Sequence, residues 1–382
     1  MLEAEKTMTQ SDSNQAGSNQ VAFRVDASID IGSGHVMRCL TLAKALKEMG
    51  FQVRFICRHQ KGHLIDKITS DGFEVEALTT RPGDDRHRPS EKGPTETTSL
   101  AHADWLEGTQ LQDAQACQPI LAQIQPDWLI VDHYALDQTW EKALRPYCRK
   151  LMVIDDLGDR THACDLLLDQ NYGASEQTYQ GRVPLHCQRL LGTQYVLLRP
   201  EFAQWRLASL KRRKNNTEVH RILVTMGGVD SDNHTGDVLT QLAKVDFDPQ
   251  VTLTVIMGAK APHLETVKQQ AAKMRVPTQV KIDVPNMAEI MAQADLAIGA
   301  AGATTWERCC LGLPSIQWAI ADNQQTIAKR LAKARIALLI TQAHQLPGLV
   351  DSAPDWMSEF SDKAQSVCDG MGVQRVCEHV AV

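Results

Sequence analysis

Residues 32–38, Gly-Ser-Gly-His-Val-Met-Arg, bring glycines, an imidazole and a guanidinium together in one short segment. They follow an apolar run at 21–26, which predicts a buried strand, and overlap the start of a helical pattern at 35–49. A junction of strand, glycine turn and helix exposes free backbone N–H groups at the positive end of the helix, which suits a phosphate. His35 adds a group that can accept a proton near neutral pH. The segment therefore predicts a site where an anion is bound and a proton is transferred.

Charged side chains surround His35 in this predicted unit. Arg24 and Asp26 lie on the strand, and Arg38 lies one helical turn beyond His35. An arginine at this place can pair with a phosphate or a carboxylate. His35 is the candidate catalytic residue, and Gly34, Arg24 and Arg38 are candidates for substrate binding. Two plainer interpretations stay open, in which His35 only lines the helix start and Arg38 is a structural partner of Asp26.

A second candidate segment is 295–307, where an apolar run is followed by small residues and then by a helical pattern. Gly302 and Ala303 would let a ligand approach the backbone closely. Thr304 can donate to a phosphate, and Glu307 can accept two hydroxyls of a ribose. The alternative is a capping box in which Glu307 supports Thr304 at the helix start.

Three more turns follow predicted strands, at the edge where parallel α/β sheets bind ligands. Gly227 lies in a Gly-Gly turn after the run at 221–226 and is a further candidate substrate contact. Asn323 and Gln324 open a helical pattern and could reach sugar hydroxyls, although helix capping by Asn323 is the simpler interpretation. After the run at 128–131 come Asp132, His133 and Tyr134. Of these, Tyr134 is the candidate to orient water or substrate.

Composition and motifs argue against several other classes of protein. The net charge of −6 gives no basic field for nucleic acid, and the run Lys-Arg-Arg-Lys at 211–214 is interpreted as a solvated linker. There is no apolar stretch of the roughly 20 residues that cross a bilayer, so we expect no membrane span. His59 and His63 are four residues apart but lack the rest of a metal-binding motif. We therefore expect neither a metal nor another cofactor.

The polar segment 1–20 has no hydrophobic stretch, which predicts a disordered tail rather than a signal peptide. The ten cysteines are scattered without a Cys-x-x-Cys pair, as expected of reduced thiols in a cytoplasmic protein. The chain is compatible with a monomer, although the sequence does not determine the oligomeric state.

Short apolar runs alternate with helical patterns along nearly the whole chain, which predicts a parallel α/β architecture. The pattern lapses and charge rises at 199–220, so we predict an N-terminal domain at 21–200 and a C-terminal domain at 201–382. Both open with strand, glycine turn and helix, which predicts two doubly wound Rossmann-type domains facing across a cleft. The segment 80–100 is expected to be a polar loop or lid, and the last helix, near 355–370, could pack back on the first domain.

Taken together, these segments closely resemble the PseG family of UDP-sugar hydrolases. The matching stretches occur in order along the chain, at 23–28, 31–43, 127–134, 153–157, 164–171, 198–202, 226–230 and 295–307. The resemblance implies a GT-B fold like that of the enzyme that adds N-acetylglucosamine in peptidoglycan synthesis. It also implies hydrolysis of UDP-2,4-diacetamido-2,4,6-trideoxy-β-L-altropyranose to UDP and the free sugar, a step of pseudaminic acid biosynthesis.

The resemblance also implies roles for particular residues. His35 would be the general base for a water molecule that attacks the anomeric carbon with inversion and without a metal. Gly302, Ala303 and Thr304 would line the diphosphate, and Glu307 would bind the ribose. Asn323 would contact the sugar. Tyr134 matches a tyrosine at the rim of the site.

Three other functions remain as alternatives. An inverting GT-B glycosyltransferase would use the same donor site, and a nucleotide-sugar sensor would bind UDP without turnover. A nicotinamide-dependent oxidoreductase is disfavoured because Met37 occupies the position of the third glycine of the dinucleotide fingerprint.

Overall fold

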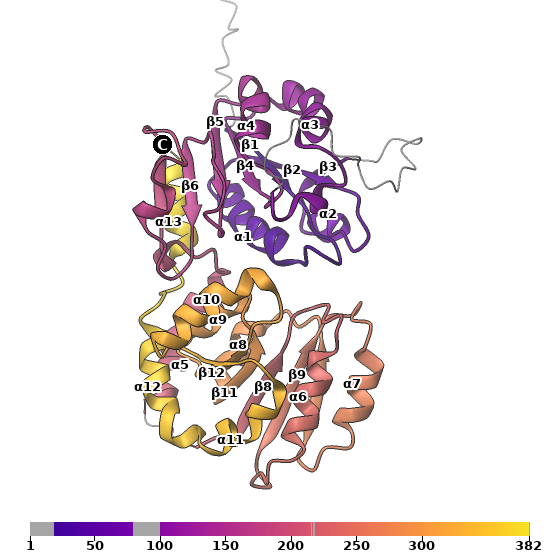
Figure 1. Ribbon diagram of the computed structural model, residues 1–382, viewed down its shortest axis with the longest axis vertical. Helices are drawn as coiled ribbons and strands as arrows, with labels where there is room; N and C mark the ends of the chain where they lie inside the picture. The colour runs from indigo at the N-terminus through magenta and orange to yellow at the C-terminus, as the bar shows by residue number, and fades with distance from the viewer. Residues whose placement is uncertain (1–18, 79–99, 215, 217, 382) are drawn as a thin grey trace, which may run out of the picture.

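The computed structural model of the chain describes residues 19–78, 100–214, 216 and 218–381, which form two α/β domains (Figure 1). The segment 1–18 of the expected tail and nearly all of the expected loop at 80–100 lie outside the described residues. The first strand begins at Gln20, one residue inside the segment that was expected to be disordered.

The first domain is built on a parallel sheet of seven strands in the order β3-β2-β1-β4-β5-β6-β7. The strands are β1 (Gln20–Val25), β2 (Gln52–Arg58), β3 (Glu74–Leu78), β4 (Trp128–Asp132), β5 (Lys150–Ile154), β6 (Leu166–Asp169) and β7 (Gln188–Leu191). The order reverses between β1 and β4, and such a switch point is where doubly wound sheets bind ligands, beyond the carboxyl ends of the strands.

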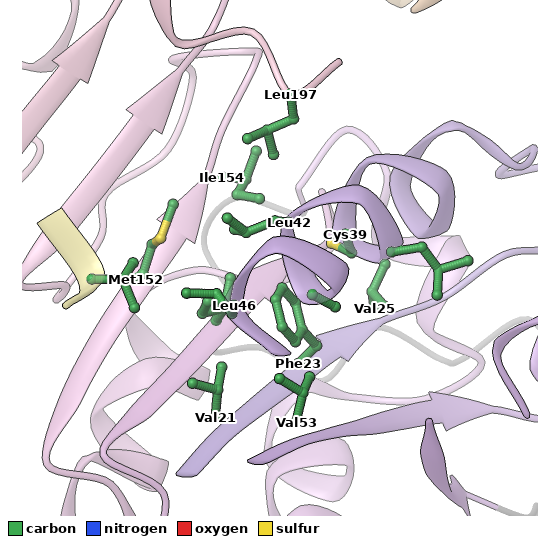
Figure 2. Packing of buried hydrophobic residues seen from close by; sticks show 14 of the residues in the cluster. Val21, Phe23, Val25, Cys39, Leu42, Leu46, Val53, Met152, Ile154 and Leu197 are labelled. Atoms are coloured by element: carbon green, nitrogen blue, oxygen red, sulfur yellow. The ribbon is translucent and has the colours of Figure 1, made fainter. Parts of the chain in front are cut away.

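Helix α1 (Gly34–Glu48) covers one face of this sheet because each of the two elements turns a row of apolar side chains toward the other. Val21, Phe23 and Val25 alternate along β1 and face Cys39, Leu42 and Leu46 of α1, as Figure 2 shows. The residues between them, such as Ala22, face a second buried cluster on the other side of the sheet. This packing fixes the start of α1 at the carboxyl end of β1. The α-helices between the later strands are α2 (Ile65–Ser70), α3 (Gln110–Ile124) and α4 (Gln138–Leu144), and the 3₁₀ turn η1 (Ala103–Leu106) precedes α3.

The second domain repeats the plan with six parallel strands in the order β10-β9-β8-β11-β12-β13. They are β8 (Arg221–Thr225), β9 (Thr252–Met257), β10 (Thr278–Ile282), β11 (Leu296–Ala300), β12 (Ser315–Trp318) and β13 (Leu338–Ile340). Its helices are α5 (Pro200–Arg213), α6 (His234–Leu242), α7 (Leu264–Ala271), α8 (Met287–Gln293), α9 (Thr304–Cys310), α10 (Asp322–Lys333), α11 (Leu346–Asp351) and α12 (Ala353–Gln365). The switch point here lies between β8 and β11.

The segment 199–220, where the domain boundary was predicted, is mostly helical. Most of it forms α5, which packs against α8 and α9. Arg213 is buried and donates to backbone carbonyls at the C-terminal ends of both helices. Arg212 pairs with the buried Asp295. The interpretation of the basic run at 211–214 as a solvated linker is therefore wrong, because two of its arginines hold the second domain together.

The chain returns to the first domain at its end. Helix α12 belongs to the second domain, whereas the final helix α13 (Gly372–Val380) packs against α1 (Figure 1). The indole nitrogen of Trp128, the first residue of β4, donates to the Val380 carbonyl at 2.9 Å and so joins the end of this helix to the first sheet. Two stretches of chain therefore connect the domains.

The carboxyl edges of the two sheets face each other. Tyr172, in the loop after β6, packs against an apolar cluster of the second domain that includes Leu331 of α10. The next residue, Gly173, lies so close to Arg330 that a Cβ there would be 3.7 Å from its Nη1. Because the strands of each sheet are parallel, the turns after β1, β4 and β5 lie on the same edge of the first sheet as this contact.

Candidate active site

His35 meets Asp132 at the switch point of the first sheet. His35 lies in the first turn of α1, after β1, and Asp132 is the last residue of the adjacent strand β4. Nδ1 of His35 is 2.6 Å from Oδ1 of Asp132. The carboxylate can only accept a hydrogen bond, so Nδ1 carries a proton, and in the neutral form of the ring the lone pair is on Nε2. Nε2 makes no hydrogen bond to any described residue, and the side chain is 10% exposed.

Arg38 holds the carboxylate of Asp132 from the other side. Its Nε and Nη2 each donate to Asp132 at 2.6 Å, a two-armed pair, and its Nη1 donates to Asp156 after β5. Burial alone would raise the pKa of Asp132, but the charge of Arg38 and the hydrogen bonds from Arg38 and His35 hold it well below its usual range. Asp132 is therefore ionised at neutral pH. The alternative pairing of Arg38 with Asp26 is wrong, and Arg38 positions Asp132 rather than pointing freely at a ligand.

Aromatic rings surround the imidazole. Tyr134 meets the His35 ring edge to face at 4.5 Å, and its hydroxyl donates to Asp156 at 2.9 Å. Burial and the charge of Asp156 raise the pKa of Tyr134, so its phenol stays protonated. Trp105, from η1, stacks on Tyr134 at 5.5 Å and approaches His35 edge to face at 6.0 Å, and His102 lies against Trp105. This aromatic wall, formed by Tyr134, Trp105 and His102, leaves apolar ring surface beside the candidate base.

Arg24 does not belong to the site, contrary to the expectation from the sequence. Its side chain is fully buried, with Nη1 2.6 Å from Asp26 and with Nε and Nη2 donating to Asp113 of α3. Arg58 also donates to Asp113. The alternation of side chains along the strand explains this outcome. Phe23 and Val25 face α1, so Arg24 between them faces the opposite side of the sheet, where α3 lies. Arg24 joins β1 to α3 and has no exposed atom for a substrate.

The turns of the second domain lie together at its own switch point. Gly227 follows β8, and the segment 301–303 follows the adjacent strand β11. Gly227 has φ of 109°, a left-handed conformation that glycine adopts without strain, and the space beside its Cα is open. Ala303 is exposed, and Gly302 and Thr304 are half-buried. These are the residues expected at the diphosphate.

Glu307 lies within the first turn of α9, partly covered. Burial raises the pKa of its carboxyl to about 7, against the opposing effect of Arg199. Nη2 of Arg199 is 3.7 Å from Oε1 of Glu307, and Arg199 belongs to the stretch that connects the domains. The capping box that was the alternative for Glu307 is not formed, since α9 has no side-chain cap at its start.

Two amides were expected near the sugar. Gln324 lies in the first turn of α10, where its Oε1 accepts from the Ile320 N–H at 3.2 Å and its Nε2 faces Gly302. It therefore lies beside the turn that follows β11. Asn323 is in the same helical turn, and its side chain lies outside what the structure describes.

Gly34 is the first residue of α1, and no atom would lie within 4 Å of a Cβ there. Ser33 precedes it without a side-chain cap, so the first amides of α1 are left for a ligand or water.

The described residues contain no group of three His, Cys, Asp or Glu side chains arranged to hold a metal ion. No helix within the described ranges is long and apolar enough to span a membrane.

Several members of the site were not predicted from the sequence. Asp132 was noticed at the end of a strand but was given no role, and Asp156, Trp105 and His102 were not candidates. The signal for Asp132 was available, because a strand neighbouring β1 brings its last residue next to the start of α1. Trp105 gave no such signal, since it follows a polar segment and lies on a short 3₁₀ turn.

Two Rossmann-type domains of this order, with facing carboxyl edges, define the GT-B class of fold. Residues 221–367 match the model for the C-terminal domain of glycosyltransferase family 28. Among solved structures, MurG of Acinetobacter baumannii has a TM-score of 0.64 at 16% identity, covering 95% of this chain and 99% of that one. That likeness shows the fold alone.

Two curated relatives are similar to this chain over most of its length. The chain is 27% identical over 315 residues to UDP-2,4-diacetamido-2,4,6-trideoxy-β-L-altropyranose hydrolase of Campylobacter jejuni, covering 82% of this chain and 96% of that protein. It is 26% identical over 302 residues to the uncharacterized protein MJ1062 of Methanocaldococcus jannaschii, covering 78% of this chain and 55% of the relative. The chain thus spans only about half the length of this archaeal relative. These matches confirm the resemblance predicted from the motifs, and the chain is similar to the PseG hydrolase over most of its length.

Proposed function

We propose that the protein hydrolyses UDP-2,4-diacetamido-2,4,6-trideoxy-β-L-altropyranose to UDP and the free sugar, with inversion, as a step of pseudaminic acid biosynthesis. The observation that carries the proposal is the hydrogen bonding of the His35 ring. Asp132 takes the proton-bearing Nδ1, which leaves Nε2 without a protein partner among the described residues and able to accept a proton. The 27% identity to the Campylobacter enzyme of that activity supports the choice of substrate.

In the proposed reaction, the oxygen of a water molecule attacks the anomeric carbon of the sugar while Nε2 of His35 takes a proton from it. The bond between that carbon and the diphosphate oxygen breaks, and UDP leaves with the electron pair on the opposite face. The resulting imidazolium is stabilised by Asp132, whose carboxylate lies 2.6 Å from Nδ1. Asp156 adds a second negative charge nearby, bound through Arg38.

The second domain would bind the nucleotide. Gly227, Gly302, Ala303 and Thr304 offer backbone N–H groups and a hydroxyl to the diphosphate, and the carboxylate of Glu307 would accept the ribose hydroxyls. Asn323 and Gln324 would contact the sugar. In this scheme the charge that develops on the leaving diphosphate is stabilised by protein donors, and the proposed reaction uses no metal.

The test is hydrolysis of the UDP-sugar in water enriched in ¹⁸O, followed by NMR and mass spectrometry. We expect ¹⁸O in the sugar and not in UDP, an initially inverted anomer, and a loss of about 10²–10⁴-fold in kcat for His35→Ala. His63→Ala, a partly exposed histidine of the same domain, is the matched control and should keep its rate. Label in UDP, retention of configuration or an active His35→Ala variant would contradict the proposal.

An inverting glycosyltransferase is the second candidate, favoured by the match to a family 28 C-terminal domain and by the GT-B fold. The two reactions differ in the group that accepts the sugar. Incubation with the UDP-sugar alone releases free sugar rapidly if the protein is a hydrolase. A transferase would need an added alcohol, and its rate of sugar transfer would rise with the alcohol concentration.

A further inference from the structure

The side chain of Arg308, in α9, is a buried cation that forms no ion pair with any residue the structure describes. It is 0% exposed, and the ion pairs among the described residues include none for Arg308. Its neighbour Glu307 pairs with Arg199 instead. Burial lowers the pKa of Arg308 to about 10, so the guanidinium still carries its charge at neutral pH. An unpaired buried charge costs several kcal/mol, so its retention calls for a compensating group.

The guanidinium lies directly beneath the turn that follows β11. Nη2 donates to the Ala300 carbonyl at 2.9 Å and to Oγ1 of Thr305 at 3.0 Å, and Nη1 donates to Oγ1 of Thr304 at 3.3 Å. Its Nε is buried and has no hydrogen-bond partner within the described part of the chain. The three acceptors lie on both sides of the turn, because Ala300 ends β11 and Thr304 and Thr305 begin α9, so the guanidinium lies against the turn.

Gly299 shows how closely the guanidinium approaches the switch point of the second sheet. A Cβ on Gly299 would be 2.5 Å from Nη1 of Arg308 and 2.7 Å from the Thr225 carbonyl at the end of β8. Only a glycine leaves room for the guanidinium between β8 and β11. The charge is therefore located at the point where a doubly wound sheet receives an anionic ligand.

The contact with Thr304 also determines what this hydroxyl can do. Oγ1 accepts a hydrogen bond from Nη1, so the hydroxyl proton points away from Arg308. Thr304 is half-buried and makes no other side-chain hydrogen bond to a described residue. Its O–H is thus left to donate outward, polarised by the cation behind it.

We propose that Arg308 is a positioning residue for the diphosphate, which orients the Thr304 hydroxyl as a donor to the ligand and supplies the positive charge that stabilises UDP as it leaves. This inference rests on the proposed function and adds to it a residue that does not touch the ligand. The diphosphate is the compensating anion that the buried guanidinium lacks in the free protein.

The experiment compares UDP with uridine by isothermal titration calorimetry, because only UDP carries the diphosphate. For Arg308→Met and for Thr304→Val we expect UDP to bind about 10- to 100-fold more weakly, with uridine unchanged, since hydrogen bonds to charged groups contribute about 1.5–3 kcal/mol. Arg308→Lys keeps the charge and should lose less affinity for UDP than Arg308→Met. Thr304→Ser keeps the hydroxyl and should bind UDP like the parent protein.

Arg206→Met is the matched control. Arg206 also donates to backbone carbonyls in the second domain, at Cys310, Gln365 and Cys368, but it does not contact the turn. Arg206→Met should therefore lose only structural contacts, and the ratio of its UDP affinity to its uridine affinity should equal that of the parent protein. If Arg308→Met does not fold, the pair Thr304→Val and Thr304→Ser decides the matter through the same ratio.

Two results would overturn the inference alone. One is that the parent protein binds UDP and that Arg308→Met or Thr304→Val binds UDP equally well. The other is an equal weakening of UDP and uridine. A parent protein that binds neither ligand would instead refute the proposed function, and the role of Arg308 with it.

Discussion

Asp132→Asn tests the arrangement on which the proposed mechanism depends. The carboxylate of Asp132 accepts from Nδ1 of His35 and twice from Arg38, each at 2.6 Å. An asparagine has one oxygen and one NH₂ group, so it cannot accept all three of these hydrogen bonds. If the oxygen faces Arg38, the NH₂ group donates to Nδ1 and forces the proton of the ring onto Nε2. The base is then lost without removal of the imidazole.

The size of the effect follows from the role of the base. General-base catalysis contributes about 10²–10⁴-fold, so a ring with the wrong tautomer should lower kcat by about 10³-fold, or about 4 kcal/mol. The affinity for UDP should change by less than about threefold, because the nucleotide is assigned to the other domain, beyond the reach of this short-range contact. The loss should therefore appear in kcat and not in UDP inhibition.

The assay combines steady-state kinetics with ¹⁵N NMR of the imidazole. In the parent protein Nδ1 of His35 should carry the proton, and in Asp132→Asn the proton should move to Nε2. Asp165→Asn is the control, since Asp165 also accepts two hydrogen bonds from an arginine, Arg145, but at the far end of the strands. The reasoning fails if Asp132→Asn keeps both the tautomer and its kcat, or if Asp165→Asn loses kcat to the same extent.

Four further outcomes follow from the structure. Glu307, with a pKa of about 7, should accept ribose hydroxyls as a carboxylate, so UDP affinity should fall about tenfold from pH 8 to pH 6, and Glu307→Gln should abolish this dependence in titration calorimetry. Trp105→Ala should raise KM for the UDP-sugar about tenfold and leave inhibition by UDP unchanged, because only the sugar would contact the ring. Arg24→Met should lower the free energy of unfolding in urea by about 3–5 kcal/mol, since it removes a buried guanidinium that pairs with two buried aspartates, with UDP affinity retained. Burial opposes protonation of His162, but Asp155 and Glu141 raise its pKa to about 9, so about 3 kcal/mol of stability present below pH 6.5 should be lost as pH rises through 9, and His162→Gln should remove that slope.

The architecture was predictable because its signals are local. A buried parallel strand is a short apolar run, and a glycine turn marks its end, so the strands at 21–26, 128–131 and 221–226 and the helix at 35–49 were found within one residue. Helix α5 was missed because its buried positions include Ser209 and Arg213, which are polar residues bonded to carbonyls of other helices. The edge strand β7 was missed because it has only four residues, two of them polar.

The candidate site was predictable only in part, because its contacts join distant segments. The motif around His35 is contiguous and was recognised, whereas its partner Asp132 is 97 residues away and Asp156 lies 118 residues from Arg38. No pattern within either segment specifies that pairing. Arg24 was misplaced for the same reason, since its partner Asp113 is 89 residues away, in a helix whose facing residues the local pattern does not reveal.

The charges of the two switch points are opposite in sign, and the proposed reaction requires that asymmetry. Around His35 two carboxylates, Asp132 and Asp156, share one guanidinium, so the first domain presents net negative charge to a ring that must become cationic. Beneath the turn after β11, Arg308 has no carboxylate of the described residues within ion-pair distance, so this part of the second domain presents positive charge to a group that must leave as an anion. A proton thus moves toward negative charge while the electron pair moves toward positive charge. In the proposed reaction, two such domains would stabilise a transition state in which charge is separated across the interface between them.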